Sequence, residues 1–244
     1  MRTILYLLSL VWCTIWYGGG CVVGGLFRVP YQRGGYYDKR QTKWARTILR
    51  WSGIPVTLQG AEHIDPSRGQ IVIANHASFF DILALLAWLP IAPKFIAKKE
   101  LFSIPVFGQA IKAAGHVRLD RKNRSKAFSA YEDSTREMNE HKLTIVVYPE
   151  GTRTRDGNLL PFKKGPFVFG IESAAPIVPC YVGGAFGIQP KGSIAVRPHP
   201  LIIALGEPIE TAGMTLDNRD GLVDQSRAAM EALKSRVDAA LPPA

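Results

Sequence analysis

The first segment of the chain is apolar without interruption. No charged residue occurs between Arg2 and Arg28, and the stretch 3–27 exceeds the ~20 residues that a helix needs to cross a bilayer core. Five glycines fall within residues 18–25, and glycine weakens a single straight helix. Two interpretations remain open: a transmembrane helix, or two short helices that meet at Gly18–Gly20 and dip into one leaflet.

Basic residues follow this segment at once. Seven bases stand against one acid, Asp38, and they are Arg28, Arg33, Lys39, Arg40, Lys43, Arg46 and Arg50. By the positive-inside tendency this flank lies on the cytoplasmic side, near anionic headgroups. We therefore expect residues 1–40 to form a membrane-associated segment and residues 41–244 to form a domain on the cytoplasmic side. A cleaved signal peptide is the alternative, although no clear A-x-A cleavage site follows.

Beyond residue 50, short β-type runs alternate with helical ones. We expect strands at Val56–Leu58, Ile71–Ala74, Lys94–Ala97, His116–Leu119, Leu143–Tyr148, Ile177–Val182, Ile194–Arg197 and Leu201–Leu205. We expect helices at Thr42–Trp51, Phe79–Trp88, Val106–Ala114, Ser125–His141, Pro166–Ser173 and Leu222–Leu241. This alternation predicts a layered α/β domain with a largely parallel sheet flanked by helices.

The composition narrows the range of partners. The chain has 244 residues with 30 Lys+Arg and 20 Asp+Glu, a formal net charge of +10 that favours an anionic partner. Residues 94–126 carry nine bases against two acids, but they lack the interleaved aromatic residues of a nucleic-acid platform and the spacing of zinc ligands. We therefore expect no nucleic acid and no metal. A solvated face that aids solubility is the alternative explanation of the basic run.

Candidate chemistry begins in the loop after the run Ile71–Ala74. There Asp81 follows His76 by five residues, and on one continuous helix such residues would lie about 140° apart. They can meet only if His76 lies in the turn and Asp81 in the first helical turn, which an N-cap at Ser78 would produce. His76 would then be a general base whose second ring nitrogen is oriented by a carboxylate. The alternative is that Ser78 and Asp81 form a capping box and His76 is an ordinary loop residue.

A second polar loop follows the run Leu143–Tyr148 and reads Pro149-Glu150-Gly151-Thr152-Arg153. Gly151 permits a tight turn, Thr152 offers a hydroxyl, and Arg153 offers a planar fork for a phosphate. An ordinary β-turn is the alternative, and it does not explain why these residue types crowd at the end of one strand.

Together the two loops resemble those of the glycerolipid acyltransferase superfamily, specifically the 1-acylglycerol-3-phosphate O-acyltransferases. Four blocks similar to the family's occur in order over residues 40–210: Asn75-His76-Ala77-Ser78-Phe79-Phe80-Asp81, then Lys98 to Gly108 continuing to Leu119-Asp120-Arg121, then Tyr148 to Arg153, and the weaker Pro176 to Tyr181. Tyr148 stands where the family usually has Phe. A lone His-x4-Asp is a poor signal, but four blocks in the right order are a strong one.

The resemblance implies an enzyme that moves an acyl chain from acyl-CoA or acyl-carrier protein to the sn-2 hydroxyl of 1-acylglycerol-3-phosphate, forming phosphatidate. His76 would remove the hydroxyl proton and Asp81 would hold the imidazole. The implied substrate-binding residues are Arg153, Glu150, Gly151, Thr152, Arg121, Lys98 and Lys99, with Asn75, Ser78 and Pro179 in support. Backbone N–H groups near Ser78 are a hypothesis for stabilising the oxyanion. The resemblance implies no metal and no cofactor besides the acyl thioester co-substrate.

Other functions remain open at this stage. Within the enzyme class, the acceptor is either lysophosphatidate or another lyso-lipid, such as a lyso-ornithine lipid or a lysophospholipid. A non-catalytic membrane protein that only binds lipid is the alternative from another class. The pair His76 and Asp81 argues against it, because a binding site has no need of a general base.

Overall fold

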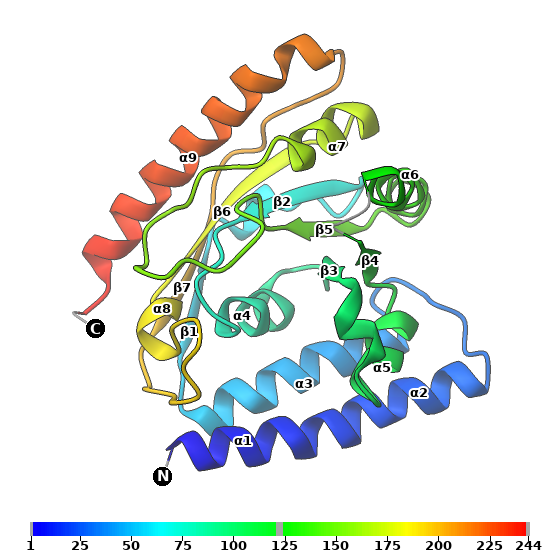
Figure 1. Cartoon of the computed structure of the whole chain (residues 1–244), viewed down its shortest axis with the longest axis vertical. Helices are drawn as coiled ribbons and strands as arrows, with labels where there is room; N and C mark the ends of the chain where they lie inside the picture. The colour runs from blue at the N-terminus through cyan, green and yellow to red at the C-terminus, as the bar shows by residue number, and fades with distance from the viewer. Residues whose placement is uncertain (1, 121–123, 243–244) are drawn as a thin grey trace.

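The computed structural model describes the backbone of residues 2–120 and 124–242 and the side chains of residues 3–120 and 131–242. Within these residues a seven-stranded sheet has the order β1-β7-β6-β2-β5-β3-β4 (Figure 1). The strands are β1 Val56–Gln59, β2 Gln70–Ala74, β3 Lys94–Lys98, β4 Val117–Leu119, β5 Thr144–Val147, β6 Ile177–Gly183 and β7 Leu201–Leu205. Neighbouring strands are parallel except β6 and β7. The predicted α/β fold with a largely parallel sheet is confirmed.

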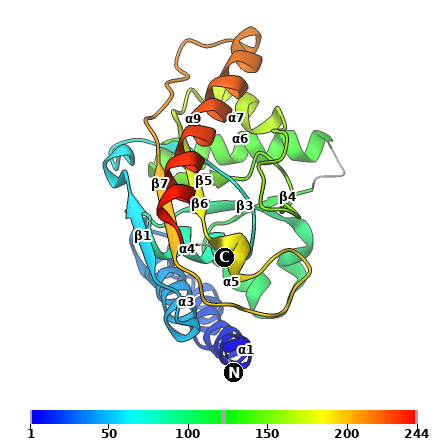
Figure 2. The same ribbon diagram turned by 90° about the vertical axis from the view of Figure 1, so that its left-hand side faces the viewer.

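Helices cover both faces of the sheet (Figures 1 and 2). They are α3 Tyr36–Ser52, α4 Phe80–Trp88, α5 Phe107–Ala113, α6 Arg124–His141, α7 Gly165–Ser173, α8 Ala185–Ile188 and α9 Arg219–Ala240, with short 3-10 helices at Ala61–His63, Lys99–Ser103 and Leu216–Asn218. Along β2, Val72 and Ala74 face the core shared with α3 and α4. Ile71 and Ile73 face the core shared with α7 and α9. The strand is therefore buried on both faces, as its apolar sequence requires.

A topological switch point lies between the neighbouring strands β2 and β5. The chain leaves β2 through α4 and returns to the sheet at β3, beyond β5. It leaves β5 on the way to α7 and returns at β6, beyond β2. Crossovers in opposite directions separate the loops after these two strands, and ligands of open α/β sheets bind in the crevice that results. The two polar loops singled out in the sequence are these two loops.

The N-terminal segment is one continuous helical run. Helix α1 (Arg2–Cys13) passes through a π-helical turn (Thr14–Gly18) into α2 (Gly19–Leu26), without the break at Gly18–Gly20 that two separate short helices require. The glycines allow close packing instead, because a Cβ at Gly24 would lie 2.7 Å from the ring of Tyr36 in α3. Of the described residues, one helix, Thr3–Leu26, is long and apolar enough to cross a membrane.

Two sequence-based expectations differ from the structure. The predicted strand Ile194–Arg197 is absent, and these residues are irregular. Both edges of β7 are already occupied by β1 and β6, and the N–H of Val196 donates instead to Oγ1 of Thr3 at 3.0 Å. In addition, α3 begins at Tyr36 rather than Thr42, so the expected domain boundary at residue 40 falls inside a continuous helix.

Candidate active site

His76 and Asp81 meet at the start of α4. Nδ1 of His76 lies 3.1 Å from Oδ2 of Asp81. Because β2 ends at Ala74 and α4 begins at Phe80, His76 lies in the turn and Asp81 in the first helical turn. A proton on Nδ1, shared with the carboxylate, leaves Nε2 as the basic nitrogen. Asp81 is fully buried whereas the His76 side chain is 17% exposed, so only the imidazole can take a proton from a bound molecule.

The Asp81 carboxylate also organises the turn. Its Oδ2 accepts the backbone N–H groups of Ala77 at 2.8 Å and Ser78 at 2.9 Å. The predicted N-cap at Ser78 is wrong, since the cap position is Phe79 and carries no side-chain cap bond. The N–H groups of Ala77 and Ser78 are already bonded to Asp81, which argues against the hypothesis that donors near Ser78 stabilise an oxyanion. One carboxylate thus both holds the turn and orients the imidazole.

Glu150 connects the two loops. Its Oε1 accepts the N–H of His76 at 2.9 Å, and its Oε2 accepts the N–H of Leu160 at 3.1 Å. The carbonyl of His76 accepts the N–H of Thr154 at 2.9 Å, so both backbone groups of His76 are bonded by the chain that follows β5. Glu150 is buried, and burial raises the pKa of its carboxyl. We expected Glu150 to bind substrate, but with both oxygens bonded to backbone it instead holds His76 in place.

The three predicted supporting residues fix the surrounding backbone. Oδ1 of Asn75 accepts the N–H of Val182 in β6 at 2.7 Å, and Nδ2 of Asn75 donates to the carbonyl of the same residue at 3.2 Å. Oγ of Ser78 donates to the carbonyl of Gln189 at 2.9 Å. The carbonyl of Pro179 in β6 accepts a backbone N–H from the end of β7 at 2.8 Å. These bonds attach the loop after β2 to β6 and to the segment after α8.

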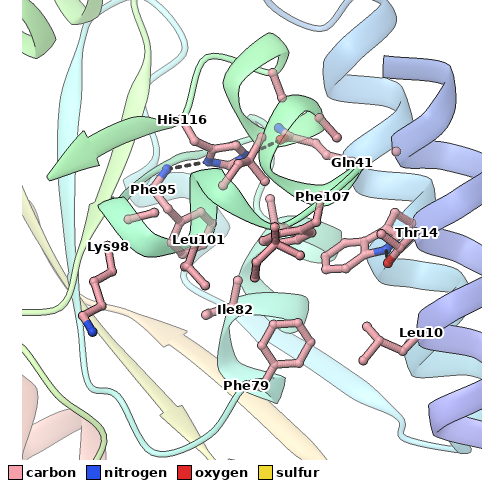
Figure 3. Close-up of a pocket in the computed structure, with 18 of the residues that line it drawn as sticks. Leu10, Thr14, Gln41, Phe79, Ile82, Phe95, Lys98, Leu101, Phe107 and His116 are labelled. Carbon is pink, nitrogen blue, oxygen red and sulfur yellow. Dashed lines mark hydrogen bonds between the residues drawn. The ribbon is translucent and has the colours of Figure 1, made fainter. Parts of the chain in front are cut away.

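A cavity of about 850 Å³ adjoins His76 (Figure 3), which is within the ~300–1,000 Å³ usual for ligand sites. Most of its lining is apolar, and the main contributors are Leu10, Gly18, Trp44, Phe79, Ile82, Phe95, Phe107 and Ala110. The walls therefore come from the N-terminal helix, α3, α4, β3 and α5. His116 is a polar exception: its Nδ1 accepts the N–H of Phe95 at 3.0 Å, and its Nε2 lies 2.9 Å from Oε1 of Gln41 (Figure 3).

Cationic side chains line the same cavity. Arg153 and Lys98 do so as predicted, together with the neighbouring Gly151 and Thr152. Gly151 has φ +69°, a left-handed conformation that favours glycine and turns the chain after β5. Lys191 also lines the cavity, and its Nζ donates to Oγ1 of Thr152 at 2.8 Å. Sequence reasoning missed Lys191, because it lies outside the four blocks and only the fold brings it beside the loop.

Two other predicted substrate-binding residues do not join this group. Lys99 points elsewhere, with its Nζ donating to Asp120 at 2.8 Å, and it is not part of the cavity lining. Arg121 lies outside the described residues. Among the residues that the structure describes, no three His, Cys, Asp or Glu side chains are placed to hold a metal ion.

Comparisons with known proteins point in one direction. The profile of the family described as Acyltransferase matches residues 55–183. A 1-acyl-sn-glycerol-3-phosphate acyltransferase of Limnanthes douglasii is 39% identical over 171 residues, which are 70% of this chain and 60% of that protein. The 1-acyl-sn-glycerol-3-phosphate acyltransferase alpha of Homo sapiens is 32% identical over 178 residues, 73% of this chain and 63% of that protein. This chain therefore spans about six tenths of the length of these curated relatives.

A solved structure is similar over nearly the whole chain. The crystal structure of the 1-acyl-sn-glycerophosphate (LPA) acyltransferase PlsC from Thermotoga maritima superposes with a TM-score of 0.77 at 26% sequence identity. The match covers 96% of this chain and 97% of that one. The likeness extends beyond residues 55–183 to the N-terminal helix and the C-terminal part of the sheet.

Proposed function

The chain belongs to the acyltransferase family, and on this premise we propose that it transfers an acyl chain from an acyl thioester to the sn-2 hydroxyl of 1-acylglycerol-3-phosphate, forming phosphatidate. The observation that carries the proposal is the His76–Asp81 pair beside a cavity that is largely apolar and has cationic residues in its wall. Lysophosphatidate has the matching parts: a hydroxyl to deprotonate, an apolar chain and a phosphate.

The reaction needs one base that later acts as an acid. Nε2 of His76 takes the proton of the acceptor hydroxyl as that oxygen attacks the thioester carbonyl carbon. The buried Asp81 stabilises the imidazolium and keeps Nδ1 protonated. When the tetrahedral intermediate collapses, the carbon–sulfur bond breaks and the imidazolium returns its proton to the leaving thiolate. The products are phosphatidate and the free thiol, and His76 regains its starting state.

The phosphate of the acceptor is assigned to Arg153, with Lys191 and Lys98 beside it. Arg153 offers a planar fork that matches phosphate oxygens, and no side-chain ion pair to a carboxylate competes for it among the described residues. Lys191 already lies at the same loop through Thr152. Acyl-CoA and acyl-carrier protein both present the thioester on an anionic carrier, and both remain candidate donors.

Membrane contact is part of the proposal. The outward side of the N-terminal helix exposes Ile4, Leu8, Val11, Ile15, Leu26 and Phe27, each at least 60% accessible. Trp12 stacks on Trp16 and on Trp51, with ring centroids 5.8 Å apart in both pairs, and such rings suit the membrane interface. The inward side packs against α3 along its length (Figure 1). A helix with one covered side is better suited to lie in the membrane surface than to be surrounded by lipid.

Vesicle flotation tests this placement, with purified protein and phosphatidylglycerol-containing vesicles. Leu8→Asp and Ile15→Asp should each reduce the floated fraction, whereas Leu216→Asp, a charge at an exposed leucine away from this helix, should not. Equal flotation of all three variants and the unaltered protein would contradict the placement. The basic residues 28–50 would then lie against the cytoplasmic leaflet, which protease accessibility in oriented vesicles reports.

The activity is tested by thiol release from acyl-CoA by detergent-purified protein, with and without lysophosphatidate. We expect release that depends on the acceptor and is lost in His76→Ala. His141→Ala, a substitution on α6, serves as the matched control and should retain activity. If the unaltered protein releases no thiol, acyl-carrier protein as donor and a panel of other lyso-lipids come next. Failure with every donor and acceptor would leave the lipid-binding alternative.

A further inference from the structure

Tyr148 lies directly against the imidazole of His76. It follows β5 and lines the cavity. Its ring stacks on that of His76 with centroids 4.1 Å apart and planes inclined by 16°. The same ring stacks with Phe95 of β3 at 6.0 Å, so the imidazole belongs to a short stack of aromatic rings anchored in the sheet.

The hydroxyl of Tyr148 reaches the carboxylate of Asp81. It donates to Oδ1 at 3.4 Å, whereas His76, Ala77 and Ser78 all use Oδ2. The two carboxylate oxygens are therefore divided: one serves the imidazole and the turn, and the other serves Tyr148. A single side chain thus touches both members of the pair.

We propose that Tyr148 is a positioning residue for the reaction proposed above: its ring fixes the plane of the His76 imidazole, and its hydroxyl fixes and tunes the Asp81 carboxylate that orients it. This inference rests on the proposed function, because it assigns His76 the role of the base. The two parts of the side chain have separable effects, which makes them testable one at a time.

The hydroxyl remains a donor throughout the working pH range. Burial and the nearby negative charge of Asp81 raise the pKa of Tyr148 well above its ordinary value. A donor on Oδ1 stabilises the carboxylate charge and so weakens the pull of Asp81 on an imidazolium. Loss of the hydroxyl should therefore raise the pKa of His76. The aromatic face acts in the opposite direction, because it attracts a cation stacked on it, so loss of the ring should lower the pKa of His76.

Other titratable and charged groups also face the pair. They are Glu150 and Arg153 from the chain after β5, Cys180 from β6, Lys98 from β3 and Lys191 from the segment after α8. All of them are the same in the unaltered protein and in variants of Tyr148. A difference between the variants therefore reports Tyr148 and not its surroundings.

Two variants separate the effects. Tyr148→Phe keeps the ring and removes the hydroxyl, and Tyr148→Leu removes both. For Tyr148→Phe we expect the acidic limb of kcat/KM against pH to move up by roughly half a pH unit, with less than about threefold loss at the plateau. For Tyr148→Leu we expect a limb below that of Tyr148→Phe, and kcat reduced on the order of tenfold because the imidazole loses its fixed plane.

A titration of the His76 imidazole completes the test. The ¹³C-labelled histidine signals of the detergent-solubilised protein are followed against pH, and His76 is identified by its absence in His76→Ala. This measurement needs no substrate, so it decides the role of Tyr148 even if lysophosphatidate proves not to be the acceptor. The order Phe variant above Leu variant, with Phe above the unaltered protein, supports the proposal. Coincident titrations of the Phe variant and the unaltered protein would overturn it.

Discussion

Oε1 of Glu150 lies 2.9 Å from the backbone nitrogen of His76, so the loop after β5 holds the residue that carries the chemistry of the loop after β2. Because β2 and β5 are neighbours in the sheet, this bond fixes one loop of the switch point relative to the other. The two loops act as one rigid unit around the imidazole.

Glu150→Gln should damage turnover more than substrate binding. The amide NH₂ of the glutamine would face the N–H of either His76 or Leu160, and a lost bond to a buried N–H costs about 1–3 kcal/mol. We expect kcat to fall about 10- to 100-fold through misplacement of His76, with KM changed less than about threefold. Glu172→Gln, at an exposed position of α7, is the control for the change of charge. A raised KM at unchanged kcat would return Glu150 to a role in binding substrate.

Lys191→Ala should weaken binding of the phosphorylated acceptor. We expect KM for lysophosphatidate to rise about 5- to 20-fold, the loss of one charge-assisted contact of about 1–2 kcal/mol, while kcat stays within about threefold. Steady-state kinetics with monoacylglycerol, which lacks the phosphate, should show no such difference. Lys112→Ala, a lysine of α5 outside this cavity, removes the same charge and should leave KM unaltered. An unchanged KM in Lys191→Ala would remove this residue from the phosphate site.

Two glycines of the N-terminal helix should respond to alanine in opposite directions. A Cβ at Gly24 would lie 2.7 Å from the ring of Tyr36, while a Cβ at Gly19 would meet nothing within 4 Å. Gly19→Ala should therefore stabilise the helix by up to about 1 kcal/mol, and Gly24→Ala should destabilise the protein by about 1–3 kcal/mol. Thermal unfolding in one detergent measures both. Similar midpoints for the two variants would show that α2 is not packed on α3 as described.

Acidification should destabilise the protein through His116. Burial, with a contribution from the charge of Lys94, lowers its pKa to about 3, against about 6.5 in an unfolded chain. Between these values the unfolded state binds more protons, so the free energy of unfolding rises with pH there and is lost as pH falls below about 6.5. We expect the melting temperature to drop between pH 6.5 and 5.

His116→Gln is the matched variant for this effect. Glutamine offers an acceptor for the N–H of Phe95 and a donor for Gln41, and it does not titrate. The fall in melting temperature between pH 6.5 and 5 should be smaller in this variant, as circular dichroism would show. The same slope in both proteins would mean that His116 is not the group responsible.

The sequence was sufficient for the sheet and for the central pair of the site. Strands such as Ile71–Ala74 are apolar at every position, which indicates burial on both faces whatever the rest of the fold. His76 and Asp81 could be placed together because their spacing is incompatible with one helix and compatible with a turn. Both arguments use local geometry alone.

What the sequence did not show depends on contacts between distant segments. Glu150 resembled a substrate ligand because a carboxylate in a polar loop is usually free, and only the fold brings the N–H groups of His76 and Leu160 to it. Lys191 is one of many lysines until the segment after α8 returns to Thr152. Ile194–Arg197 has an apolar pattern, but no strand edge is left for it to pair with.

The π-helical turn Thr14–Gly18 sets the rotational phase of the N-terminal helix. Such a turn accommodates one extra residue in a helix, so removing one residue there would restore regular winding and rotate α2 by about 100° relative to α1. Cys21 and Gly24, which face the protein, would then turn toward lipid. A single deletion at this point should therefore be more harmful than substitution of any one of the exposed apolar residues, because it changes the orientation of every residue that follows in the helix.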